Sequence, residues 1–344
     1  MVMIPFFNRL LLLLAFPFGL YAQAASPIAQ PGQPSAGPGG SEYIHQEVVF
    51  QDFATDPDGY WLFEPASPRP DSADVIVFLH GYGGYNPMIY GQWIRHLVRK
   101  GHIVIFPRYQ KNLVFPRPPR FARNCAQAIR DALTELEGEG HVKPRLDALV
   151  FAGHSYGGVI GAKLGVQFEK FNIPKPKGLL LCAPGTGPLT GGRLRSYKHM
   201  PSDTKMVIVV SKNDEVVGEK MAKRIFRTAA NTPDRNLLYL YQDLYGQPSL
   251  KASHNQSYSL DMEFDSGVRN FTAKRALRIA KVDAVDYGVY WKLLDAMVDC
   301  IRDGEHCEIA LGGGYLQTGV GKWSDGTSMQ ALRAVLPPDI EDQK

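Results

Sequence analysis

The sequence contains few cysteines and carries little net charge. Four cysteines occur in 344 residues, and no Cys-x-x-Cys or Cys/His spacing indicates a zinc site. The net charge of +4 is small and evenly spread, which argues against a nucleic-acid-binding protein. The local basic patch at 117–120 is interpreted as a solvated loop. The chain is long enough to bury a large core, and one α/β domain is favoured over two equal ones.

The chain begins with a basic residue, a short apolar run and a small-residue site. Arg9 precedes the apolar stretch 10–16, and Ala22-Gln23-Ala24 follows that stretch. This order predicts a secretory signal peptide over residues 1–24. The apolar stretch is too short, and too interrupted by prolines, for a strong membrane span, although an uncleaved anchor is the alternative. We therefore expect an exported protein, periplasmic or extracellular, without a stable membrane span after cleavage.

The next residues have the composition of a linker. Residues 25–40 read ASPIAQPGQPSAGPGG, a Pro/Gly-rich sequence that cannot bury a core. A single domain is therefore expected over residues 41–344.

An exported chain can hold disulfides, and two of the four cysteines lie close together in sequence. Cys300 and Cys307 stand at the end of a helical pattern and across a short turn, so we predict that they are bridged. Cys182 lies in an apolar run and is expected to be buried, and Cys125 lies on a helical pattern. A bridge between Cys125 and Cys182 stays open, because sequence does not determine connectivity.

Strand-like and helical patterns alternate along most of the chain. Continuous apolar runs such as 75–79 and 206–210 are typical of strands buried on both faces of a parallel sheet. Alternation with helices predicts a doubly wound α/β fold, a mostly parallel sheet of about eight strands with helices on both faces. The first two strands lack an intervening helix and predict an antiparallel hairpin at one edge. The expected strands are 44–51, 59–64, 74–80, 102–107, 147–152, 178–183, 205–211 and 236–241, and the expected helices are 88–100, 120–137, 156–170, 217–229 and 283–302.

The segment 153–157 has the form Gly-x-Ser-x-Gly between a strand and a helix. An apolar run at 147–152 enters the turn, and small residues from Gly158 onward leave it. This arrangement is typical of a nucleophile elbow, in which Ser155 is exposed at the tip of a sharp turn. A glycine-rich turn with an ordinary serine is the alternative. The elbow indicates acyl transfer through the serine hydroxyl.

A serine nucleophile needs a base, and the base needs a carboxylate. Asp214 follows the strand 205–211 and is the predicted acid, with Glu215 as the fallback and a helix N-cap as the alternative role of Asp214. His254 lies in a loop after the last predicted strand and is the predicted base. Both residues follow the carboxyl ends of strands, which is where the binding and active sites of open α/β sheets lie. His306 sits in the cysteine loop and His199 precedes the acid, so neither suits the expected order.

The oxyanion formed by serine attack needs two hydrogen-bond donors. We expect one from the backbone N–H of Tyr156, directly after the nucleophile. The other is expected from the glycine-rich loop after strand 74–80, where the N–H of Tyr82 is favoured over that of Gly83. Tyr85 in the same loop is a predicted substrate contact, with packing as the alternative. Neither this loop nor residues 319–322 has the spacing of a phosphate-binding loop.

Together these motifs resemble those of the α/β-hydrolase superfamily. The resemblance rests on His80-Gly81-Tyr82-Gly83-Gly84, on the elbow at 153–158, and on the order Ser155, Asp214, His254. It covers about residues 44–302 and is nearest to esterases related to dienelactone hydrolases, chlorophyllases and cutinase-type polyesterases. The chain differs from dienelactone hydrolases in having serine as the nucleophile. It differs from the lipase branch in having Tyr82 within the glycine-rich loop.

The resemblance implies a serine hydrolase that cleaves carboxylic esters through an acyl-enzyme. It implies no cofactor and no metal, and its partner is a small or polymeric ester. Segments 185–203 and 256–282 are expected to form small caps around the site. A serine acyltransferase or peptidase with the same residues is the alternative, followed by a non-catalytic binding protein of the same fold. The acyl group, the alcohol and the oligomeric state are left open.

Overall fold

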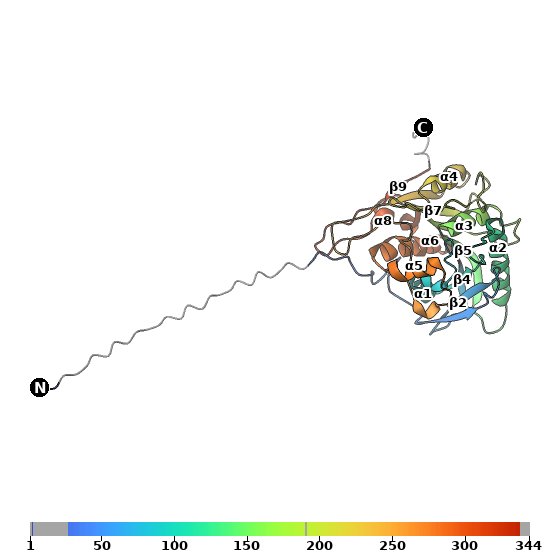
Figure 1. Cartoon of the computed structure of the whole chain (residues 1–344), viewed down its shortest axis with the longest axis horizontal. Coiled ribbons are helices and arrows are strands. Elements are labelled where there is room, and N and C mark those ends of the chain that lie inside the picture. Colours follow the sequence, from blue (N-terminus) through green and yellow to red (C-terminus); the bar gives the residue numbers. More distant parts are fainter. Residues whose placement is uncertain (1, 3–26, 190, 338–344) are drawn as a thin grey trace.

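A mostly parallel β-sheet forms the centre of the protein. The structure, a computed structural model, describes residue 2, residues 27–189 and residues 191–337 (Figure 1). The described part contains nine strands in the order β1-β2-β4-β3-β5-β6-β7-β8-β9. The strands are β1 (Glu47–Asp52), β2 (Tyr60–Ala66), β3 (Ser72–Leu79), β4 (His102–Pro107), β5 (Lys143–His154), β6 (Gly178–Cys182), β7 (Lys205–Ser211), β8 (Arg235–Leu240) and β9 (Arg333–Val335).

The direction of the strands follows their connections. Strands β4, β3, β5, β6, β7 and β8 run parallel. Strands β1 and β2 form an antiparallel hairpin at one edge, and β2 pairs antiparallel with β4. The predicted hairpin and the predicted mostly parallel sheet are thus confirmed. A short hairpin suffices to join antiparallel strands, whereas parallel neighbours need a crossover.

Helices cover both faces of this sheet. They are η1 (Pro87–Tyr90), α1 (Gly91–Arg99), α2 (Pro118–Glu135), α3 (Tyr156–Val166), α4 (Lys220–Thr228), η2 (Met262–Phe264), α5 (Phe271–Ile279), the π-helix η3 (Asp286–Trp291), α6 (Lys292–Arg302), α7 (Cys307–Leu311) and α8 (Tyr315–Thr318). Figure 1 shows α2 and α3 on one side of the sheet and α1 and α6 on the other. The α/β class predicted from the sequence is therefore confirmed.

The core is divided into two clusters, one on each face of the sheet. Strand β3 shows the division: Ile76 and Phe78 join the cluster under α1 and α6, while Val75, Val77 and Leu79 join the cluster under α2, α3 and α4. Successive side chains of a strand point to opposite faces, so a run without polar residues supplies both clusters. This explains why the central strands have no alternating pattern.

Several elements differ from those expected. The predicted helix 88–100 is divided into η1 and α1, and the predicted helix 283–302 begins as η3 before α6. Strand β9 and helices α5, α7 and α8 were not predicted. Strand β9 has three residues, and its pairing with Leu237–Tyr239 of β8 forms only when distant parts of the chain meet. Such a short segment carries no periodic signal of its own.

The segment predicted as a linker contacts the domain. Its described part, 27–40, has no helix or strand, yet the N–H of Gly39 donates to Oδ2 of Asp295 at 2.8 Å. Ile28 packs against the core, and the Tyr287 hydroxyl donates to the carbonyl of Pro31. Residues 27–40, predicted as a linker, therefore lie against the folded domain. Composition shows that the segment builds no core, but its backbone groups still bind the folded domain.

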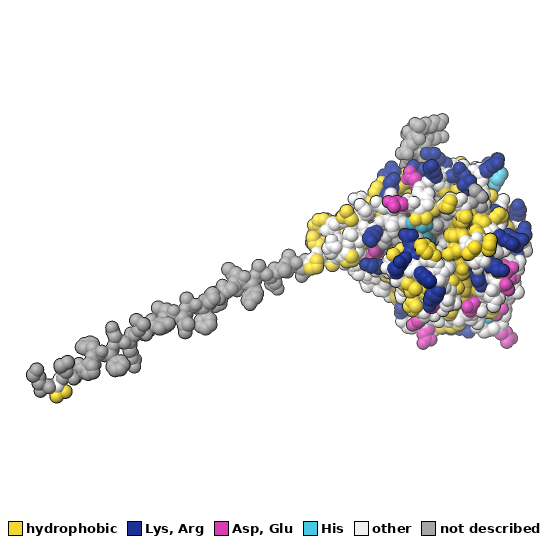
Figure 2. All heavy atoms as spheres, in the orientation of Figure 1, with side chains coloured by type: hydrophobic (Ala, Val, Ile, Leu, Met, Phe, Trp, Pro, Cys, Tyr) yellow, Lys and Arg dark blue, Asp and Glu magenta, His cyan; other side chains and the backbone are white. Residues whose placement is uncertain are grey.

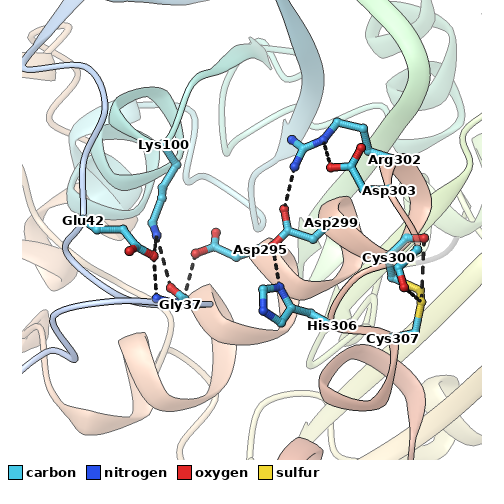
Figure 3. A network of polar contacts seen from close by, with 12 residues as sticks. Gly37, Glu42, Lys100, Asp295, Asp299, Cys300, Arg302, Asp303, His306 and Cys307 are labelled. Atoms are coloured by element: carbon cyan, nitrogen blue, oxygen red, sulfur yellow. Dashed lines mark hydrogen bonds and ion pairs between the residues drawn. A yellow bond between two sulfur atoms is a disulfide. The ribbon is translucent and has the colours of Figure 1, made fainter.

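A buried hydrogen bond between His96 and Asp295 supports the same segment. Nε2 of His96 lies 2.9 Å from Oδ2 of Asp295, and Asp295 is 5% exposed. Burial alone would raise the pKa of Asp295, but the charge and hydrogen bond of His96 and the N–H of Gly39 outweigh burial and lower that pKa. Figure 3 shows Lys100 and Glu42 beside Gly37, with Asp295 of α6 facing them. Asp295 of α6 and Lys100, directly after α1, thus bind the segment through Gly39 and Gly37.

Cys300 and Cys307 form a disulfide at the end of α6, also drawn in Figure 3. Cys125 and Cys182 are both buried and free, so the bridge between them that the sequence left open does not form.

Within the described residues, no helix has the length and apolar character needed to cross a membrane.

Helix α3 approaches the backbone of β3 at Gly157. A Cβ atom at this position would lie 2.0 Å from the carbonyl oxygen of Leu79 and 2.5 Å from that of His80. Only a hydrogen atom fits there, and the obstructing atoms are backbone that has no rotamer to change. The glycine therefore sets the distance between helix and sheet at the start of α3.

We predict that Gly157→Ala destabilises the protein. Relief of the clash requires movement of α3 or β3, and overpacking of this kind costs about 1–3 kcal/mol or more of unfolding free energy. Urea unfolding followed by tryptophan fluorescence measures the change. Gly314→Ala is the matched control, because no atom lies within 4 Å of the added methyl group. Equal unfolding midpoints for the two variants would contradict the prediction.

Candidate active site

The structure brings Ser155, His254 and Asp214 together at one edge of the sheet. Oγ of Ser155 lies 2.9 Å from Nε2 of His254, and Nδ1 of His254 lies 2.7 Å from Oδ2 of Asp214. Ser155 follows β5, Asp214 follows β7, and His254 lies in the loop after β8. Parallel strands end at the same edge, which is why residues so distant in sequence meet there.

Ser155 has an unusual backbone conformation. Its φ is 55° and its ψ is −118°, values that cost free energy for a residue with a side chain. Two hydrogen bonds hold this conformation: the N–H of Ser155 donates to the carbonyl of Cys182 at 2.8 Å, and the N–H of Gly185 donates to the carbonyl of Ser155 at 3.2 Å. Both partners belong to β6 or its following loop. The neighbouring strand thus stabilises the sharp turn between β5 and α3.

Asp214 is held by hydrogen bonds on both carboxylate oxygens. Oδ1 accepts from the N–H groups of Val216 and Val217 at 2.8 and 3.0 Å, and Oδ2 faces His254. Burial alone would raise the pKa of Asp214, but the hydrogen bond and charge of His254 and the two N–H groups outweigh burial and lower that pKa. Helix α4 has Glu219 as its N-cap, so Asp214 is not the cap of that helix.

The other residues considered for these positions lie elsewhere. Glu215, the fallback acid, is exposed. His306 pairs with Asp299 at 3.0 Å, beside the disulfide, and His199 is exposed. His254 is 8% exposed and is the histidine that faces Ser155.

Residues 53–193 match the family model described as Chlorophyllase. The chain has an α/β-hydrolase fold. The match, together with the sheet, confirms the predicted resemblance to α/β-hydrolase esterases of the chlorophyllase-related branch. Among curated proteins, none matches the chain.

The matched segment covers only part of the site of this α/β hydrolase. It includes Tyr82, Ser155 and Tyr156, whereas Asp214 and His254 lie beyond its end. The match indicates an ester-hydrolysing α/β hydrolase. The arrangement of acid and base therefore rests on the structure of this chain.

The glycine-rich loop lies beside Ser155, since a Cβ atom at Gly81 would be 3.3 Å from Cβ of Ser155. The N–H of Gly83 donates to Oε1 of Gln110 at 2.8 Å and is therefore engaged. The N–H groups of Tyr82 and Tyr156 donate to no other group in the part of the chain that the structure describes. Of the two donors considered in the loop, Tyr82 is thus the one with a free N–H.

Part of the predicted second cap contacts this loop. Nδ2 of Asn270 donates to the carbonyl of Gly83 at 2.8 Å, and the hydroxyl of Thr272 donates to the carbonyl of Tyr82 at 3.2 Å. Both residues lie at the start of α5, within the segment 256–282. The start of α5 therefore supports the loop from outside the sheet.

The three tyrosines predicted around the nucleophile differ in their surroundings. The rings of Tyr82 and Tyr156 are 6.4 Å apart, and their hydroxyls donate to the carbonyls of Leu113 and Gly191. Tyr85 is 6% exposed, and its ring packs beside His80 and the guanidinium of Arg108. The burial of Tyr85 favours the packing role that the sequence left open.

His154, the variable residue before the nucleophile, links the loop to the predicted base. The N–H of Gly81 donates to the Tyr90 hydroxyl at 2.9 Å, which in turn donates to Nδ1 of His154 at 2.9 Å. Nε2 of His154 then donates to the carbonyl of His254 at 2.8 Å. The sequence did not indicate this series of hydrogen bonds. His154 is an unspecified position of the elbow, and Tyr90 lies in an amphipathic helical pattern.

Burial lowers the pKa of His154 to about 3. The imidazole is therefore neutral at ordinary pH, which agrees with its hydrogen bonds: one nitrogen accepts and the other donates.

No group of three or more His, Cys, Asp or Glu side chains suited to a metal occurs within the described residues.

We predict that burial of His154 destabilises the protein in acid. A histidine in the unfolded chain titrates near pH ~6.5, whereas His154 in the folded protein has its pKa at about 3. The unfolded state binds more protons between these values, so the unfolding free energy falls as pH decreases through this window. The contribution is at most about 1.4 kcal/mol per pH unit.

The test is urea unfolding over a pH series from about 6 to 4. His154→Gln, which cannot titrate, is expected to show a shallower loss of stability than the unchanged protein. The exposed residue His199 supplies the control, as His199→Gln. If His154→Gln and the unchanged protein lose stability with the same slope, the prediction is wrong.

Proposed function

We propose that this protein is an exported serine hydrolase that cleaves carboxylic esters through an acyl-enzyme intermediate. The single observation that carries the proposal is the hydrogen-bonded series from Oγ of Ser155 through His254 to Asp214. A hydroxyl, an imidazole and a carboxylate in this order form a nucleophile, a base and a group that orients the base.

The reaction begins when Nε2 of His254 takes the proton of Ser155 as Oγ attacks the ester carbonyl. Asp214 accepts the hydrogen bond from Nδ1 of His254 and stabilises the imidazolium that forms. The backbone N–H groups of Tyr82 and Tyr156 hold the oxyanion. The tetrahedral intermediate then collapses, His254 protonates the leaving alcohol, and the acyl group stays on Ser155.

Hydrolysis of the acyl-enzyme repeats these steps with water as the nucleophile. His254 takes a proton from water, the hydroxide attacks the acyl carbonyl, and a second tetrahedral intermediate forms. Its collapse breaks the bond to Oγ, and His254 returns the proton to Ser155. The low pKa of Asp214 keeps its carboxylate ionised during both halves of the reaction.

The proposal of export rests on the predicted signal peptide and on the disulfide. Residues 1–24 lie outside the described residues, apart from residue 2. A disulfide between Cys300 and Cys307 is typical of proteins that fold in oxidising compartments. We also propose one domain over 41–344, with segments 185–203 and 256–282 beside the active site.

We predict that Ser155→Ala abolishes ester hydrolysis without unfolding the protein. Loss of the nucleophile is expected to reduce kcat for p-nitrophenyl acetate by about 10⁴-fold or more. Circular dichroism checks that the variant is folded. Ser202→Ala, a change of an exposed serine, is the matched control and is expected to keep full activity. Undiminished hydrolysis by folded Ser155→Ala would overturn the mechanism.

We also predict that the acyl group becomes bound to Ser155. A fluorophosphonate probe is expected to label the protein at Ser155, and rapid mixing with p-nitrophenyl acetate is expected to give a burst of p-nitrophenol equal to the enzyme concentration. Peptide mapping locates the label. Labelling at another residue, or no labelling, would favour a binding protein. Faster acyl transfer to an added amine or alcohol than to water would favour an acyltransferase.

A further inference from the structure

Two cavities lie among the residues that follow β6 and β7 and the start of α4. The first has a volume of about 270 Å³ and is lined by Gly185, Val217, Lys220, Arg193 and Arg224, among others. The second has a volume of about 550 Å³ and shares Arg193 and Arg224 with the first. Arg193 and Arg224 thus face both cavities.

Residues that line these cavities form hydrogen bonds with the proposed active-site residues. Gly185 donates its N–H to the carbonyl of Ser155, and Val217 donates its N–H to Asp214. In the second cavity, the carbonyl of Gly191 accepts a hydrogen bond from the Tyr156 hydroxyl at 2.8 Å. An ester bound at Ser155 therefore has one of its two substituents close to these walls.

The charges that face these cavities all have the same sign. Arg193, Lys220 and Arg224 line the first cavity, Arg195 joins Arg193 and Arg224 in the second, and no acidic residue lines either cavity. None of these four side chains forms a hydrogen bond or an ion pair with another described residue. The positive charge of Arg193 also acts on the Tyr156 phenol, against the effect of burial, which raises the pKa of that phenol to about 12.

Helix α4 provides an internal comparison. Lys223 pairs with Glu219 at 2.6 Å, whereas Lys220 and Arg224 are like charges at i and i+4 without an acidic partner. Such a pair destabilises a helix unless an anion lies between the charges. Figure 2 shows Lys and Arg side chains gathered over α4. On α4, the basic residues that line the first cavity therefore have no acidic partner in the described protein, unlike Lys223.

We infer that the ester cleaved at Ser155 carries an anionic group, a carboxylate, sulfate or phosphate, that binds Arg193, Lys220 and Arg224. This inference rests on the proposed function. Guanidinium groups bind such planar or tetrahedral anions through paired hydrogen bonds. The anion lies among these side chains while the ester carbonyl is at Ser155.

The test compares matched anionic and neutral esters. For an anion on the acyl side, the pair is the p-nitrophenyl monoester of adipic acid and p-nitrophenyl heptanoate. For an anion on the alcohol side, the pair is 4-acetoxybenzoate and 4-acetoxybenzamide. We expect the ratio of kcat/KM, anionic over neutral, to exceed one in at least one pair and to fall as salt is added.

The double variant Arg193→Gln/Arg224→Gln is expected to reduce that ratio by about 2- to 30-fold, as for the loss of two exposed ion pairs. Arg224→Glu is expected to reduce it further. Lys223→Gln is the matched control on the same helix and is expected to leave the ratio unchanged. Fluorophosphonate labelling checks that each variant has an intact site.

Two outcomes would overturn the inference alone: neutral esters preferred in both pairs, or a preference for the anionic ester that survives in the double variant. Absence of hydrolysis of all four esters by the unchanged protein, with no fluorophosphonate labelling, would instead overturn the proposed function.

Discussion

The contact between Gly157 and the backbone of β3 is the constraint on which the candidate active site depends. Helix α3 lies so close to β3 that a methyl group at Gly157 would overlap the carbonyl of Leu79. The chain must therefore turn sharply between β5 and α3, and Ser155 takes a positive φ as a result. Hydrogen bonds from β6 and its loop compensate part of this cost. Close packing thus exposes the serine hydroxyl at the edge of the sheet.

A series of buried polar groups around Ser155 connects elements that are distant in sequence. Gly81, Tyr90 and His154 link the glycine-rich loop to the carbonyl of His254, while Val216 and Val217 hold Asp214. Each buried donor in this series has an acceptor, as low local polarity requires. These hydrogen bonds connect the glycine-rich loop, the elbow and the loops of His254 and Asp214. Two nearby cavities are lined by Arg193 and Arg224, whose charges have no partner in the described protein.

Much of the fold could be read from the sequence, because buried parallel strands leave continuous apolar runs. Strands such as β3 and β7 lie within two residues of their predicted bounds. The elements that were missed, including β9 and α5, are short or exposed and form where the folded domain offers a partner. Residues 27–40 illustrate the same limit: their composition excludes a core, but it could not show that Asp295 would bind the N–H of Gly39.

The sequence alone indicated the serine of the elbow, the order of the proposed serine, acid and base, and the strands that carry them. These follow from local patterns, since turn chemistry and apolar runs act over a few residues. Tertiary structure decided that Asp214, not Glu215, faces His254, and that the N–H of Gly83 is engaged by Gln110. It also decided the contact of His154 with His254 and the gathering of basic side chains around the two cavities. Such contacts join residues far apart in sequence, and their geometry exists only once the sheet and helices have packed.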